Sequence, residues 1–238
     1  MELVYKYYPE SRTEYLTNEL MRFSQPSVLN DPFECTPTLS NTQLAYLSDI
    51  SAHIHPFPSD SKDIRNSTRS RFLSQVSNRL DRDLGILSLS RRWDSALMWA
   101  HYCSSHTGYC LGFNSSHPFF AAEGLPEFEG APIQTVVYRN NRVSAFFRKI
   151  ENPEILELLC TKGLDWAYEE EVRVLRHLSK AKTITDNPKT PNTPAYLFKV
   201  PHDALAEIII GMKASSQLRD ELITLGKTLG VPVYISKI

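Results

Sequence analysis

Short runs in which apolar and polar residues alternate recur along the chain, and they predict β-strands. The clearest cover residues 3–8, 85–90, 109–113 and 133–139, which are rich in β-branched and aromatic side chains. In residues 166–175, Tyr168, Val172 and Val174 alternate with charged side chains. This pattern predicts a further strand, with Glu169, Glu171 and Arg173 on one of its faces.

Apolar residues at helical spacing separate these strands. They predict helices over residues 142–162, which Pro153 divides, and 215–229, together with two helices within residues 39–84. Helices between strands, but not after each one, indicate the α+β class. We therefore expect a single domain over residues 1–238, with a split mixed β-sheet of about seven or eight short strands, surrounding helices, and residues 39–84 as a helical insertion covering one side.

Charged side chains on one face of the strand at 166–175 are the first candidate site. Two carboxylates and a guanidinium are costly to bury unless they pair or bind a ligand. An aromatic and histidine-rich segment, residues 93–113, is the natural partner surface. The alternatives are an ion-pair ladder on a solvated sheet face and, for Trp99, His101 and Tyr102, core packing with a satisfied histidine.

Composition narrows the class of protein. The 238 residues are 42% hydrophobic and 22% charged, with a formal net charge of -1, so the chain lacks the basic surplus of a dedicated nucleic-acid binder. Local basic patches at Arg91, Arg92 and residues 139–148 keep a nucleic-acid partner open. No apolar run is long enough for a membrane span and the N-terminus does not resemble a secretory signal, so we expect cytoplasmic localisation and no membrane partner.

Two short motifs leave their role open. His101, Cys103, His106 and Cys110 have zinc-type side chains, but one stretch of ten residues is poorly placed to surround a metal, and we expect none. Residues 30–34, Asn-Asp-Pro-Phe-Glu, predict a turn, because Asn and Asp bond nearby amides and Pro fixes φ. That turn either is structural, with Arg22 pairing to Asp31 or Glu34, or presents the two carboxylates.

Several motifs occur in one order along nearly the whole chain. They are Tyr5-Lys-Tyr7, Arg22-Phe-Ser24, Asn30-Asp-Pro-Phe-Glu34, Met98-Trp-Ala-His-Tyr102, His106-x-Gly108, Gly112-Phe113, Val137-Tyr138, Lys162 and Trp166-x-Tyr-Glu-x-Glu-x-Arg173. The set resembles a widespread bacterial family known only as a domain of unknown function, number twenty-nine seventy-one. Leu89 and Cys103 depart from the aromatic and small residues usual there.

The layout of that family is similar to ADP-ribosyltransferase-type folds, and this likeness implies roles for individual residues. The implied catalytic residues are Glu171 and Glu169, and the implied cofactor-binding residues are Lys6, Tyr7, Ser90, Trp99, His101, Tyr102 and Arg173. Lys6 or Tyr7 would hold the NAD diphosphate or adenosine ribose. Ser90, Trp99 and Tyr102 would wall the nicotinamide.

The resemblance implies an NAD-cleaving enzyme, an ADP-ribosyltransferase or NAD glycohydrolase acting as a toxin or phage-defence effector. NAD would be a substrate, a protein or nucleic acid the acceptor, and an antitoxin or neighbouring defence protein a partner. Two alternatives stay open. One is a metal-dependent nuclease that uses Asp31, Glu34, Glu169 and Glu171. The other is a non-catalytic nucleotide-binding module.

Overall fold

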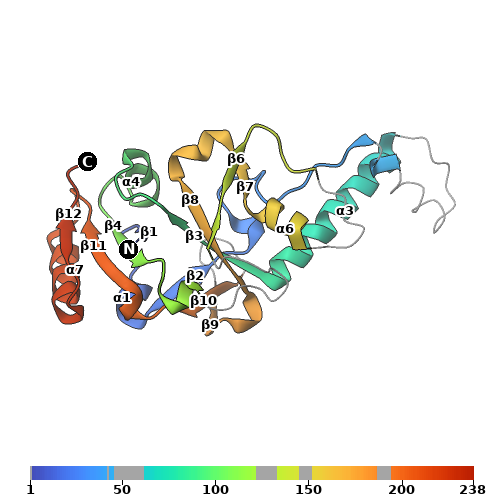
Figure 1. The fold of residues 1–238 in the computed structure, drawn as a ribbon. Coiled ribbons are helices and arrows are strands. Elements are labelled where there is room, and N and C mark those ends of the chain that lie inside the picture. The colour runs from blue at the N-terminus through green and yellow to red at the C-terminus, as the bar shows by residue number, and fades with distance from the viewer. Residues whose placement is uncertain (1, 42, 46–61, 122–132, 145–151, 187–193) are drawn as a thin grey trace.

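A seven-stranded mixed sheet forms the centre of the computed structural model (Figure 1), which describes residues 2–41, 43–45, 62–121, 133–144, 152–186 and 194–238. In spatial order its strands are β12 (Val233–Ile235), β11 (Leu205–Ile210), β4 (Tyr109–Asn114), β1 (Leu3–Tyr8), β3 (Leu84–Ser90), β8 (Glu171–His177) and β5 (Ile133–Thr135). Within this sheet β11 and β12 run parallel, and the other neighbours are antiparallel.

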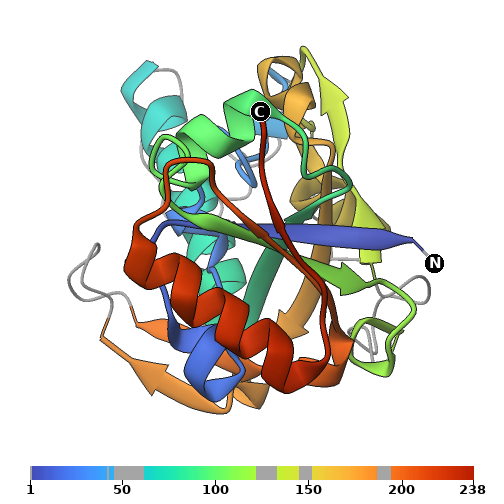
Figure 2. The same cartoon turned by 90° about the vertical axis from the view of Figure 1, so that its left-hand side faces the viewer.

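Two smaller sheets and the helices surround this sheet. The small sheets are β2 (Leu20–Phe23), β10 (Ala195–Lys199) and β9 (Thr183–Thr185), and the parallel pair β6 (Val137–Arg139) and β7 (Thr161–Gly163). The α-helices are α1 (Glu14–Asn18), α3 (Lys62–Asp83), α4 (Ala96–Tyr102), α5 (Pro118–Ala121), α6 (Asn152–Leu159) and α7 (Ser216–Leu229). The described residues also form four 3₁₀ turns, which are η1 (Pro26–Val28), η2 (Leu164–Glu169), η3 (Leu178–Lys180) and η4 (His202–Ala204). Helices α7 and α3 lie at opposite ends of the molecule (Figure 1), and Figure 2 shows α7 in front of the sheet. The predicted α+β class and a mixed sheet of seven strands are confirmed, and the two smaller sheets bring the strands of the described residues to twelve.

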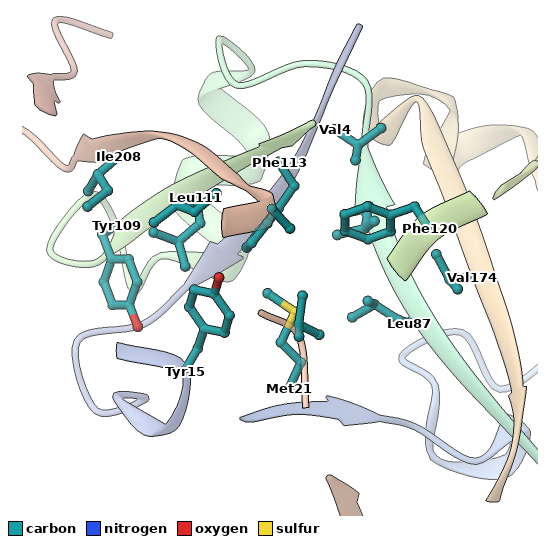
Figure 3. Packing of buried hydrophobic residues seen from close by; sticks show 14 of the residues in the cluster. Val4, Tyr15, Met21, Leu87, Tyr109, Leu111, Phe113, Phe120, Val174 and Ile208 are labelled. Carbon is teal, nitrogen blue, oxygen red and sulfur yellow. The ribbon is translucent and has the colours of Figure 1, made fainter. Parts of the chain in front are cut away.

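The largest hydrophobic cluster lies on one face of the central strands (Figure 3). Alternation along β3 and β8 points Leu87, Leu89, Val172 and Val174 to this face, where each is at most 3% exposed. Side chains from β2, β10 and α7 complete the cluster. Burial of these apolar side chains is the main source of stability for the sheet.

The opposite face carries two separate hydrophobic clusters. The first gathers Tyr5, Tyr7, Met98, Trp99, Cys103, Cys110 and Ile209 around α4. The second gathers Val76, Leu80, Leu84, Ile86, Ile155, Leu158, Leu159 and Leu175 under α3 and α6. Ser88, Ser90, Glu171 and Arg173 are paired across β3 and β8 on this face. A polar strip therefore divides the two clusters.

Strand β1 and the end of β2 approach the same edge of β3 from its two ends, and they diverge near Ser88. Strand β1 is paired with β3 through Tyr5 and Ser90 alone. At the other end of the same edge, Ser24 and Ile86 exchange two backbone hydrogen bonds of 2.8 Å. We call this divergence of β1 and β2 the fork.

Three predicted elements differ from the structure. The predicted strand at 166–175 is wrong in its first part, because residues 164–169 form η2 and Glu170 has a left-handed φ of 43° before β8 begins. The predicted helix at 142–162 is also wrong at both ends, because residues 142–144 are not helical and Ser144 forms a bridge with Thr38. Helix α6 stops at Leu159, and Lys162 lies on β7, opposite Tyr138 of β6.

The predicted strand at 133–139 divides at Val136. Its N–H donates to the carbonyl of Glu171, so β5 joins β8 while β6 turns away to β7. In the predicted insertion, α3 confirms one helix. Residues 46–61 of the other lie outside the described residues.

Candidate functional site

A cavity of about 230 Å³ lies in the polar strip between the two hydrophobic clusters. Its lining residues are Tyr5, Lys6, Tyr7, Ser24, Val28, Leu29, Asn30, Glu34, Ser88, Leu89, Ser90, Met98, Tyr102, Lys162, Glu169 and Glu171. Its tyrosines come from β1 and α4, and Tyr102 of α4 is hydrogen-bonded to Glu169. The charged side chains of Glu34, Lys162, Glu169 and Glu171 form what we call the charged wall. This combination of aromatic and ionised groups at one concave place makes the cavity the candidate site.

Lys162 links two carboxylates of the charged wall. Its Nζ lies 2.5 Å from Oε2 of Glu169 and 2.9 Å from Oε2 of Glu171. A third carboxylate, that of Glu34, lies 3.8 Å away. All four side chains are at most 6% exposed. Ions at this burial are tolerated because each is paired.

Arg173 holds Glu171 from behind the cavity wall. Its Nε and Nη2 donate to the two carboxylate oxygens of Glu171 over 2.8 and 3.0 Å, which is a bidentate pair. It also contacts Glu34 and donates to the carbonyl of Leu159. Because Arg173 is fully buried and does not line the cavity, its structural role is to fix Glu171.

The turn at residues 30–34 is structural at Asp31 and presents only one of the two carboxylates, that of Glu34, to the cavity. The carboxylate of Asp31 accepts the N–H of Phe33, and the N–H of Glu34 donates to the Asp31 carbonyl, so Asp31 shapes the turn. Asn30 and Glu34, at its two ends, line the cavity. The pairing of Arg22 with Asp31 or Glu34 does not occur, since Glu34 contacts Arg173 and Lys162 instead.

Burial and pairing oppose each other in the pKa values of these groups. Burial raises the pKa of Glu171, and Lys162 counteracts part of that rise. For Lys162, burial favours the neutral form, but Glu171 and Glu169 outweigh it and raise the pKa. Burial lowers the pKa of Lys6 to about 8, against the attraction of both carboxylates. At neutral pH Lys162 is therefore firmly charged, whereas Lys6 is close to losing its proton.

Four predicted cofactor residues, Lys6, Tyr7, Ser90 and Tyr102, line the cavity. Tyr102 donates to Oε1 of Glu169 over 2.5 Å and accepts from the amide of Asn30. The hydroxyl of Ser90 donates to the Glu169 carbonyl, which anchors the end of η2. The hydroxyl of Tyr7 donates to the carbonyl of Arg92 over 2.9 Å. The predicted association of β1, α4 and the two glutamates is therefore present in the structure.

Trp99 and His101 occupy other places than predicted. Trp99 is fully buried, its Nε1 donates to the carbonyl of Trp93 over 2.7 Å, and its ring packs edge-on against Tyr7. It supports the cavity wall from the core and does not form it. His101 is exposed and lies 3.0 Å from the hydroxyl of Tyr168, outside the cavity.

Replacing Trp99 by phenylalanine should lower stability while leaving the cavity chemistry in place. The carbonyl of Trp93 loses its donor, which costs about 1–3 kcal/mol when the group stays buried. Urea denaturation measures this cost. The affinity of the folded variant for small cavity ligands should be within about twofold of the parent. A large loss of affinity with unchanged stability would show that the indole touches the ligand.

The most important residue that the sequence did not assign is Lys162. It was part of the motif set, but the predicted helix placed it away from the strand carrying Glu171. Tyr5 and Asn30 were missed as wall residues for a similar reason, because only the folded chain brings them to the cavity. The signal available in the sequence was an isolated lysine next to a glycine, before the aromatic and acidic run.

The carboxylates of the nuclease hypothesis are arranged unfavourably for a metal ion. Lys162 and Arg173 engage the oxygens of Glu169 and Glu171, and Asp31 does not line the cavity. Within the part of the chain that the structure describes, no three His, Cys, Asp or Glu side chains are grouped to hold a metal. The donor set therefore fits ion pairing better than metal coordination.

None of the described helices is long and apolar enough to span a bilayer.

Comparisons with known proteins add one match. No curated protein and no solved structure matches the chain. Residues 98–174 match the model of a family described as "Protein of unknown function (DUF2971)". This segment contains Tyr102, Lys162, Glu169 and Glu171, and the match supports the resemblance to that family over the part of the chain that supplies most of the charged wall.

Proposed function

We propose that the cavity binds the nicotinamide–ribose end of NAD and that the protein cleaves the bond between them, as an ADP-ribosyltransferase or an NAD glycohydrolase. The observation that carries this proposal is the pair of buried carboxylates, Glu169 and Glu171, which line one small cavity together with three tyrosines. The similarity of the layout to ADP-ribosyltransferase-type folds agrees with it at the level of analogy.

The chemistry needs a fixed negative charge beside the ribose. When the bond from C1′ to the nicotinamide nitrogen breaks, its electron pair leaves with nicotinamide and C1′ becomes oxocarbenium-like. A nearby carboxylate stabilises that charge. A nucleophile, either water or an acceptor group, then bonds to C1′ and gives up a proton to solvent.

Glu171 is the better placed carboxylate for this role. Arg173 and Lys162 hold both of its oxygens, so its position changes little when the charge develops. Preorganised charge of this kind contributes more to catalysis than a group that must reorient. Glu169 is held by Tyr102 and Lys162 and lies beside it, where it can accept a ribose hydroxyl.

The cavity volume limits which part of NAD enters. Sites for whole drug-sized ligands measure about 300–1,000 Å³, and this cavity is smaller, at about 230 Å³. It suits one ring and one sugar between Tyr5, Tyr7 and Tyr102, with the phosphates at its mouth. Aromatic side chains there provide stacking surface for the nicotinamide.

Incubation of the pure protein with NAD tests the proposal. We expect released nicotinamide, measured by mass spectrometry, with either free ADP-ribose or a mass increase on an added protein or nucleic acid. Reduced NAD is the matched control, because its dihydronicotinamide is a poor leaving group and should stay attached. If neither form of the dinucleotide is bound or changed, the proposed function is wrong.

A further inference from the structure

Arg22 is a half-buried cation that the site described above does not use. Its Nε is buried and has no hydrogen-bond partner among the residues that the structure describes. A buried guanidinium nitrogen without a partner carries a full desolvation cost, which an anionic ligand can relieve. Burial, and the nearby charge of Arg12, lower the pKa of Arg22, as expected for a cation without a counter-ion.

The fork brings Arg22 close to Lys6. Extending the antiparallel register of Ser24 and Ile86 by two residues sets Arg22 level with Ser88. From β1, Nζ of Lys6 donates to the carbonyl of Ser88 over 2.7 Å. The charge of Arg22 is near enough to Lys6 to contribute to lowering its pKa, so both cations belong to the region where β1 and β2 separate.

This region is one end of the cavity. Lys6, Ser24 and Ser88 line the wall there, and Glu171 is paired with Ser90 two residues further along β3. Two residues of a strand span about 7 Å, comparable with the length of a ribose and its 5′-carbon. A ligand whose ribose lies at Glu171 would place its next group, a phosphate, at the fork.

We propose that Lys6 and Arg22 form an anion subsite at the fork, which binds a phosphate group of the ligand. For NAD this group is the diphosphate, and in naming it the inference rests on the proposed function. An ammonium and a guanidinium together supply charge-assisted hydrogen bonds to phosphate oxygens. The two partly buried like charges repel each other, and a phosphate between them turns that repulsion into binding energy.

Calorimetry with three probes tests the subsite: inorganic pyrophosphate, ADP-ribose and nicotinamide. Arg22→Ala should weaken pyrophosphate and ADP-ribose at least about tenfold, the loss expected for a charged hydrogen bond, and leave nicotinamide unchanged. Arg22→Lys keeps the charge and should recover part of the affinity. Arg82→Ala is the matched control, because Arg82 is 72% exposed and paired with Asp83. Equal phosphate affinity in Arg22→Ala and the parent overturns the proposal.

The same probes separate this inference from the proposed function. If pyrophosphate binding depends on Arg22 but NAD is not cleaved, the subsite stands and the NAD-cleaving function fails. If NAD is cleaved and Arg22→Ala has an unchanged KM, the function stands and the subsite fails. Thermal unfolding shows whether each variant is folded. If Arg22→Ala does not fold, the affinity of Arg22→Lys for pyrophosphate tests the subsite instead.

The affinity for ADP-ribose should also fall as the pH rises from 7 to 9. Lys6, whose pKa burial lowers to about 8, loses its charge over this range, and its attraction for the anion disappears. The charged groups around it are Glu171, Glu169, Arg12 and Arg22. Lys6→Arg keeps its charge and should remove most of this pH dependence. An unchanged fall in that variant would mean that Lys6 does not contact the phosphate.

Discussion

Replacing Glu171 by glutamine is expected to slow nicotinamide release from NAD by at least about 100-fold, the usual loss when one preorganised group opposite the developing charge is removed. The substitution keeps the shape of the side chain but removes its charge. The neutral amide cannot stabilise the ribosyl cation. Single-turnover measurement of nicotinamide release, with enzyme in excess over NAD, reports this step directly.

Stability must be measured beside activity, because Glu171 is also a structural anion. Its amide analogue would direct N–H groups at Arg173 or Lys162, which are themselves donors. We expect a loss of about 1–3 kcal/mol in the free energy of unfolding, with a folded protein at room temperature. Glu170→Gln is the control, since Glu170 is next in sequence, is exposed and pairs only with Arg92 among the described residues. Full activity in Glu171→Gln would show that the cavity carboxylate is not catalytic.

Local sequence patterns were sufficient to predict a helix or strand where residues close to it in the chain decide its structure. The alternation in residues 3–8 predicts β1 with the bounds that the structure has. Ser215 and Ser95 cap α7 and α4 through their hydroxyls, which accept from Leu218 and Met98. In each case the signal, an alternation or a capping residue, lies within a few residues of the element.

Patterns failed where a distant contact overrides a local preference. Residues 166–175 alternate like a strand, yet their first part forms η2. The hydroxyl of Ser90 takes the carbonyl of Glu169, and Glu170 in a left-handed conformation closes the turn. Since Ser90 belongs to another strand, no window around Glu169 contains this information.

The candidate site was predicted in its residue types better than in its geometry. Glu171, Glu169 and Tyr102 were identified as a group, and they do share one cavity. The reason given for the two glutamates, one face of one strand, was wrong. They meet because Lys162 binds both, and Lys162 lies on β7, which the sequence presented as the end of a helix.

Removing the charge of Arg173 is expected to destabilise the fold more than any other change to the site. Arg173→Met leaves a side chain of similar length, but Glu171 loses its bidentate partner and Glu34 loses its closest cation. Breaking a buried ion pair by removing one partner costs about 3–5 kcal/mol. Urea unfolding should show this loss. Arg82→Met, which breaks the exposed pair with Asp83, should leave the unfolding midpoint nearly unchanged.

A double substitution tests whether that loss comes from uncompensated charge. In the parent protein, Glu34→Gln should be destabilising, because Arg173 and Lys162 then lose a carboxylate. In the Arg173→Met background the same change removes a buried anion that has lost its main partner, so it should cost at least about 1 kcal/mol less, or become stabilising. Additive free energies would instead assign the effect of Arg173→Met to packing. Coupled free energies would assign the effect of Arg173→Met to the Glu34 carboxylate that it leaves buried without its guanidinium partner.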